Sequence, residues 1–148
     1  MVIVVRGLPA PQGSKSFKGM AGGHAILAES SKKVKPWREA VKSAALDAWY
    51  VDHHSTEGIT PIAGPIDVEM IFTMPRPKSA KRGARPSTRP DLSKLIRSTE
   101  DALTDVGAWE DDARVVRVTA MKVFTGQHGD SLTTPGAVIR IERMAAPY

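Results

Sequence analysis

The 148-residue chain is 41% hydrophobic and 5% aromatic, and its formal net charge is +5 at pH 7. These values favour one globular domain spanning residues 1–148 and exclude a disordered chain. The absence of cysteine excludes disulfides, thiolate zinc sites and cysteine nucleophiles, and it fits a cytosolic protein. No apolar run reaches the length of a membrane span. The positive charge favours a polyanionic partner without identifying one.

The first half of the chain predicts a strand, a loop, a helix and a second strand. Residues Val2–Leu8 are β-branched and apolar, as in a strand, and Pro9–Gly23 carries the Pro, Gly and Ser of a loop. Between Pro36 and Tyr50, apolar residues recur on one helical face. Apolar residues alternate over Ile66–Met74, which predicts the second strand.

The second half predicts one more helix and two more strands. Apolar residues spaced three and four apart indicate a helix at Asp91–Asp105, ended by Gly107. Strands are expected at Arg114–Phe124 and Gly136–Met144. The order β-α-β-α-β-β indicates an α+β fold with two main helices on a mixed four-stranded sheet.

Residues 75–90, the basic loop, contain four prolines and six cations and no acid. Loops of this length are often functional, and we expect this one to be mobile. A second basic run, Lys32 to Lys35, precedes the first predicted helix. Cations gathered in this way suit the phosphates of a nucleic acid, although they can also serve only solubility.

Acidic residues mark both ends of the second predicted helix. Asp91 stands at its start, and the triplet Glu110-Asp111-Asp112 stands just before the next strand. We expect Asp91 and Asp112 to converge at one end of the sheet, where carboxylates would repel one another unless a cation were bound. Mg²⁺ takes one or two carboxylates and activates water, as phosphodiester hydrolysis requires. The simpler alternatives are that Asp91 only caps the helix and that the triplet is a solvated turn.

The segment from Arg89 to Val116 resembles the RusA-type Holliday-junction resolvases, endonucleases of phages and prophages. The resemblance rests on Arg89-Pro90-Asp91-Leu92 with Leu95, on Asp101-Ala102-Leu103, and on Trp109-Glu110-Asp111-Asp112 followed by Val115-Val116. The family pattern is close to R-x-D-L-D-N-L, then D-A-L, then W-x-D-D-x-x-V, and the spacing matches without gaps. The run Pro9–Lys15 is also similar to a loop that many members carry after the first strand.

This resemblance implies a RusA-like homodimer that binds four-way DNA junctions and cuts two strands of like polarity with Mg²⁺, or with Mn²⁺ instead. The family's three catalytic aspartates fall on Asp91, Ser93 and Asp112, with Asp111 beside the last. The serine puts the number of direct metal ligands in doubt: Asp111 or a water would complete the site, or activity would be weakened. The expected metal ligands are therefore Asp91, Asp111 and Asp112, in a protein of the cytoplasm (the host's, if a phage encodes it).

Cations complete the predicted site. A family lysine falls on Arg97, and Lys94 replaces the usual asparagine; both can neutralise a nonbridging phosphate oxygen, and Arg97 suits clamping better than proton transfer. The residues expected to contact DNA are Lys15, Lys18, Lys32, Lys33, Lys35, Arg76, Lys78, Lys81, Arg82, Arg85 and Arg89. Three hypotheses stay open: a metal-dependent resolvase, a DNA-binding protein with a weakened site, and an interaction protein whose charges serve solubility.

Overall fold

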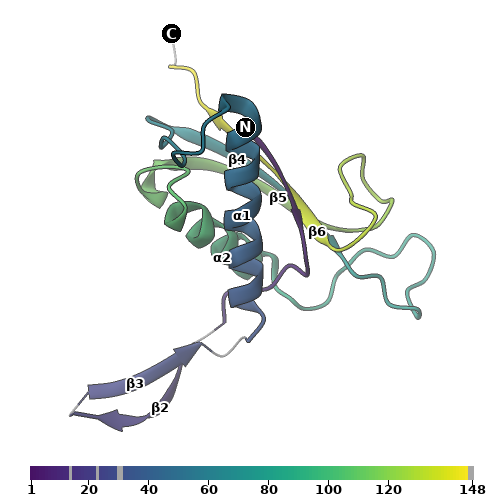
Figure 1. Cartoon of the computed structure of the whole chain (residues 1–148). Helices are drawn as coiled ribbons and strands as arrows, with labels where there is room; N and C mark the ends of the chain where they lie inside the picture. Colours follow the sequence, from purple (N-terminus) through teal and green to yellow (C-terminus); the bar gives the residue numbers. More distant parts are fainter. Residues whose placement is uncertain (14, 23, 30–31, 147–148) are drawn as a thin grey trace.

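A computed structural model of the protein describes residues 1–13, 15–22, 24–29 and 32–146. The elements, in chain order, are β1 (Val2–Arg6), β2 (Lys15–Ala21), β3 (His24–Glu29), α1 (Val34–His53), β4 (Ile66–Met74), α2 (Leu92–Asp105), the short 3₁₀ helix η1 (Asp112–Arg114), β5 (Val115–Phe124) and β6 (Gly136–Arg143). Figure 1 shows α1 and α2 lying over the sheet. The predicted α+β fold with two main helices on a mixed four-stranded sheet is confirmed.

The four strands of the main sheet follow the spatial order β1-β6-β4-β5. Strand β6 runs antiparallel to both β1 and β4, whereas β4 and β5 are parallel neighbours. Parallel neighbours begin at the same end of the sheet, so the connection between them must run back from the end of the first strand to the start of the second. Helix α2 makes this return, so its first residue lies near the end of β4 and its last near the start of β5.

The core lies between the helices and one face of the sheet. Trp37 of α1 and Leu95 of α2 are buried there with Ile3, Met70 and Ile139 of the sheet, each 1% exposed or less. Burial of these side chains explains the helical and alternating apolar patterns, because only one face of each element meets the core. The Trp37 indole N–H donates to the Thr99 hydroxyl at 3.1 Å, which joins the two helices.

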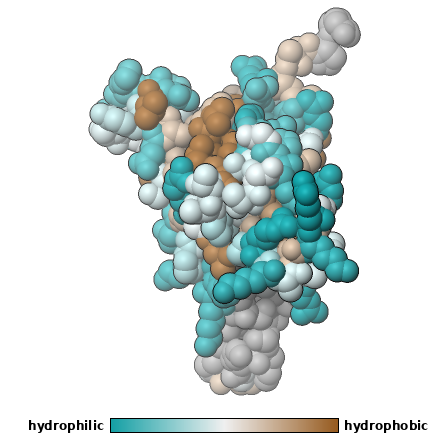
Figure 2. All heavy atoms as spheres, turned by 90° about the vertical axis from the view of Figure 1, so that its right-hand side faces the viewer, coloured by the Kyte–Doolittle hydropathy of each residue, from teal (hydrophilic) through white to brown (hydrophobic). Residues whose placement is uncertain are grey.

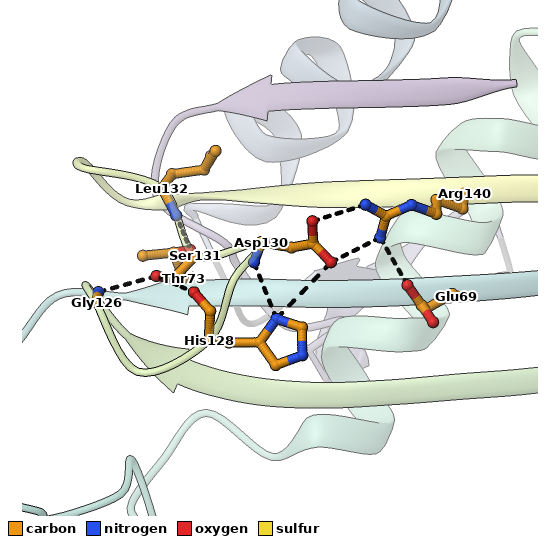
Figure 3. A network of polar contacts seen from close by, with 8 residues as sticks. All are labelled: Glu69, Thr73, Gly126, His128, Asp130, Ser131, Leu132 and Arg140. Atoms are coloured by element: carbon orange, nitrogen blue, oxygen red, sulfur yellow. Dashed lines mark hydrogen bonds and ion pairs between the residues drawn. The ribbon is translucent and has the colours of Figure 1, made fainter.

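The opposite face of the sheet is partly covered by the connection between β5 and β6. Within this connection, Asp130 forms an ion pair with Arg140 of β6 at 2.7 Å, and Arg140 also binds Glu69 of β4 (Figure 3). The Leu132 N–H donates to the Thr73 hydroxyl at 2.8 Å. Figure 2 shows hydrophobic residues reaching the surface in a band bordered by hydrophilic ones.

One local prediction was wrong. The segment 9–23 was expected to be a loop, but Lys15–Ala21 forms a strand that pairs antiparallel with His24–Glu29. Gly19 within this strand and a register shift between Phe17 and Gly19 interrupt the alternation that indicates a strand. The hairpin extends away from the body of the molecule in Figure 1. The side chains of Lys15 and Lys18, predicted to contact DNA, lie outside the part of the chain whose side chains are described.

Candidate active site

Asp91 occupies the N-cap position of α2, with φ −67° and ψ 133°, yet its carboxylate accepts no capping hydrogen bond. The side chain is exposed, and its nearest ion-pair partner is the Lys94 ammonium at 3.8 Å. A carboxylate that served only to cap would accept a helix N–H. The geometry therefore leaves the oxygens of Asp91 available to a ligand.

Lys122 fixes the segment that carries Asp91. Its ammonium, projecting from β5, donates to the carbonyl oxygens of Thr88 at 2.7 Å and Pro90 at 2.8 Å. Hydrogen bonds from a charged donor are stronger than neutral ones. The end of the basic loop is thereby tied to the C-terminal half of β5, and Asp91 follows directly.

The second acidic group lies at the other end of α2. A hollow of about 350 Å³ is lined by Arg38, Asp101, Thr104, Asp105, Glu110, Asp111 and Asp112. Asp111 caps the short helix η1, since its carboxylate accepts the Ala113 N–H at 2.7 Å. That hydrogen bond is the main cause that lowers the pKa of Asp111, and a hydrogen bond with the Asp112 side chain and the charge of Arg114 lower it further.

The acidic hollow carries more negative charge than its cations offset. Arg38 binds Asp105 at 2.5 Å and Arg114 binds Glu110 at 2.7 Å, but within the described residues Asp101 and Asp112 have no ion-pair partner. The acids also adjoin the C-terminal, electronegative end of α2. On the same helix, burial raises the pKa of Glu100, and repulsion from Asp112 and Asp101 raises it further. A bound cation would relieve this repulsion.

One chain does not bring Asp91 and Asp112 together, contrary to the expected convergence. The 14 residues of α2 separate them, and at a rise of about 1.5 Å each they span roughly 21 Å. Strand β5 gives a similar separation, because Lys122, beside Pro90, is about 23 Å along an extended strand from Val115, next to η1. Among the described residues, no three His, Asp or Glu side chains are grouped so as to hold a metal ion. The metal-ligand assignment of Asp91, Asp111 and Asp112 stays a prediction.

Of the predicted phosphate-binding side chains, Lys94 lies 3.8 Å from Asp91, and the basic loop ends directly before Asp91. Lys94 and Arg97, three residues apart on α2, lie on one exposed side of the helix. All six cations of the basic loop are exposed. The loop is attached to the body by Arg76, whose guanidinium lies 5.4 Å from the centre of the Phe124 ring, and by a hydrogen bond from Gln127 to the Ala84 carbonyl. Lys32, Lys33 and Lys35, at the start of α1, are also exposed.

The sequence profile of a family described as endodeoxyribonuclease RusA matches residues 7–142. The chain belongs to the RusA family. The match includes both acidic groups, the basic loop and the hairpin. No curated protein matches the chain significantly. Within the described part of the chain, no helix combines the length and apolar character needed to cross a bilayer.

Ser93 marks the clearest departure from the RusA family pattern at this site. It lies in the first turn of α2, two residues after Asp91, and its side chain is exposed. A hydroxyl brings no negative charge, so this end of α2 offers a metal one carboxylate instead of the two that the resemblance implies.

Three side chains at the site were missed or set aside by sequence reasoning. Asp101 belongs to the family motif, but its place opposite the acid triplet appears only when α2 packs beside η1. Arg38 lies on α1, far away in sequence, and carries no local signal of its role. Lys122 is one cation within a strand, and only its hydrogen bonds to the basic loop show what it fixes.

Proposed function

We propose that this protein is a Mg²⁺-dependent Holliday-junction resolvase that works as a homodimer and cuts two DNA strands of like polarity. The observation that carries the proposal is the acidic hollow of a chain from an endodeoxyribonuclease family, where no described residue forms an ion pair with Asp101 or Asp112. Carboxylate oxygens are the ligands that Mg²⁺ prefers. Such a substrate would place the protein in the cytoplasm, the host's if a phage encodes it.

The homodimer explains how two acidic groups about 21 Å apart can form one site. Among the described strands, β5 pairs with β4 alone, and it forms the edge of the sheet. Its N-terminal half is exposed, with Val116 60% and Val118 37% accessible. Open, apolar strand edges favour pairing with another chain, and a two-fold axis would pair β5 of one protomer antiparallel with β5 of its partner.

Antiparallel pairing sets the start of one β5 beside the end of the other. Asp112 precedes the start of β5, and Asp91 is tied to its C-terminal half through Lys122. The pairing would therefore bring Asp112 of one protomer toward Asp91 of its partner, twice, once on each side of the two-fold axis. Two equivalent sites suit a two-fold junction, in which both cuts are symmetric.

The chain's own residues have distinct parts in this proposal. The carboxylates of Asp91 and Asp112, with Asp111 beside them, would hold Mg²⁺, which supplies an activated water and a sink for charge on the leaving oxygen. Lys94 and Arg97 would neutralise the nonbridging oxygens of the phosphate under attack. The basic loop and the lysines before α1 would hold neighbouring phosphates, largely without regard to sequence.

A second candidate function follows from Ser93. A protein that binds junctions tightly but cuts them slowly or not at all would fit one carboxylate where the family has two. In this alternative, Ser93→Asp raises cleavage without tightening DNA binding, because it restores a metal ligand and adds negative charge. A resolvase that is fully active with Ser93 would gain nothing from the same change.

Cleavage of a synthetic four-way junction in Mg²⁺, compared with a plain duplex, tests the proposal. Wild-type protein should cut the junction selectively, and Asp112→Asn should abolish cutting while junction binding persists. Asp52→Asn is the matched control, because Asp52 is an exposed aspartate of α1 that is not among the residues lining the acidic hollow. Unchanged turnover in Asp112→Asn would remove this residue from the site, and the absence of salt-sensitive DNA binding would end the proposal altogether.

A further inference from the structure

A cavity lined by prolines lies where β4 and β5 end, directly before Asp91. It has a volume of about 320 Å³ and is enclosed by the chain that follows β1 on one side and the basic loop on the other. Six prolines form much of its wall: Pro9, Pro11, Pro75, Pro77, Pro86 and Pro90. Met74 and Phe124 add apolar surface at the ends of β4 and β5. We call this space the proline cavity.

The charged groups of the proline cavity are all cations. Lys33, Arg89 and Lys122 line it, and none of its lining residues is an Asp or Glu. Lys122 uses two of its three N–H donors on the carbonyls of Thr88 and Pro90, so one donor remains for a ligand. Lys33 and Arg89 are exposed and line the cavity from different segments, one from the start of α1 and one from the basic loop.

This combination selects the class of ligand. The aliphatic rings of proline can pack against the faces of a planar apolar group, and three cations without an acid suit an anion attached to it. A nucleotide of a DNA strand has both parts, a base and a phosphate. The volume lies at the small end of ligand sites, which favours a single nucleotide over a longer stretch of strand.

We propose that the proline cavity receives one unstacked nucleotide of the bound DNA junction, with its base between the prolines and its phosphate at Lys33, Arg89 and Lys122. The inference rests on the proposed junction-binding function and goes beyond it, since phosphate contacts alone need no base pocket. Extruding a base costs least where stacking is already interrupted, as at the crossover of a four-way junction. Arg89 and Pro90 immediately precede Asp91, so the held nucleotide is close in the strand to the phosphate at the proposed catalytic carboxylate.

Photo-crosslinking with a thiolated base locates the nucleotide directly. Four-way junctions carry 4-thiothymidine at single positions around the crossover, and Ca²⁺ replaces Mg²⁺ so that the DNA stays intact. After irradiation, mass spectrometry maps the cross-linked peptides, and gel mobility of the same samples reports binding. We expect a crossover position to label cavity residues such as Met74 or Phe124.

Two variants sharpen the test. Pro77→Trp should fill the cavity and reduce this cross-link to near background while the junction stays bound. Pro77 is exposed, and its carbonyl accepts a hydrogen bond from the Ala80 N–H, which the substitution leaves in place because it changes only the side chain and the backbone nitrogen. Pro61→Trp is the matched control, an exposed proline outside the cavity, and should label as wild type does.

The outcomes separate the inference from the function. Tight junction binding with labels only outside the cavity, or with labelling unaffected by Pro77→Trp, would overturn the inference and leave the resolvase proposal standing. Failure of the wild-type protein to bind the junction would overturn both.

Discussion

Mixing two inactive variants gives the sharpest test of a site shared between protomers. Asp91→Asn and Asp112→Asn should each abolish cleavage alone. In a heterodimer of the two, one shared site carries both substitutions and the other carries neither. If Asp91 and Asp112 act from different protomers, the mixture regains activity; if they act from one chain, every site lacks a carboxylate and the mixture stays inactive.

The expected magnitude follows from the geometry. Random exchange of subunits places the two variants together in about half of the dimers, each with one intact site out of two, so roughly a quarter of wild-type sites return. The product should be junctions nicked on one strand rather than resolved, because the second site of each heterodimer is inactive. Gel analysis of a labelled junction after co-refolding distinguishes the two products.

The reasoning depends on the separation of about 21 Å along α2, which no side chain spans. Mixing either variant with itself is the control and should give no product. A mixture that remains inactive, although heterodimers are demonstrated by differently tagged chains, would refute the shared site.

Two further predictions concern the scaffold around the site. Lys122→Met removes the hydrogen bonds to the Thr88 and Pro90 carbonyls, and should destabilise the fold by about 1–3 kcal/mol in urea unfolding; cleavage should fall more than junction affinity, and an equal loss of both would contradict a positioning role. The pKa of Asp130 is lowered in the folded protein, chiefly by its hydrogen bond with Arg140. The ionised Asp130 therefore stabilises the fold above the ordinary carboxyl pKa of about 4, and this stabilisation is lost as the pH falls through the lowered pKa of the folded state. Asp130→Asn should therefore lower the urea midpoint at neutral pH and leave it nearly unchanged at the lowest pH, whereas an equal loss at both would rule out this pair as the cause.

Several elements could be predicted from the sequence because their signals are local. The alternation over Ile66–Met74 gave both bounds of β4, and the helical spacing from Asp91 to Asp105 gave α2 within one residue. These patterns record which side chains face a core, and one face per element suffices to produce them. The motif spacing was enough to indicate the RusA family, which the profile match confirms.

The β2–β3 hairpin was missed because its glycines and shifted register hide the alternation of apolar residues. Its two strands also pair with each other rather than with the main sheet. Lys122 and Arg38 were missed for a related reason: each acts on residues more than 30 positions away in the chain, through contacts that no local pattern records.

The sequence by itself determined which acids and cations the protein carries and the order in which helices and strands present them. Only the tertiary structure decided where Asp91 and Asp112 lie relative to each other. Because β5 runs parallel to β4, the chain must cross the full length of the sheet between these two residues, and α2 holds them at opposite ends. Spacing along a chain cannot reveal this separation, since it depends on the direction in which one strand joins its neighbour.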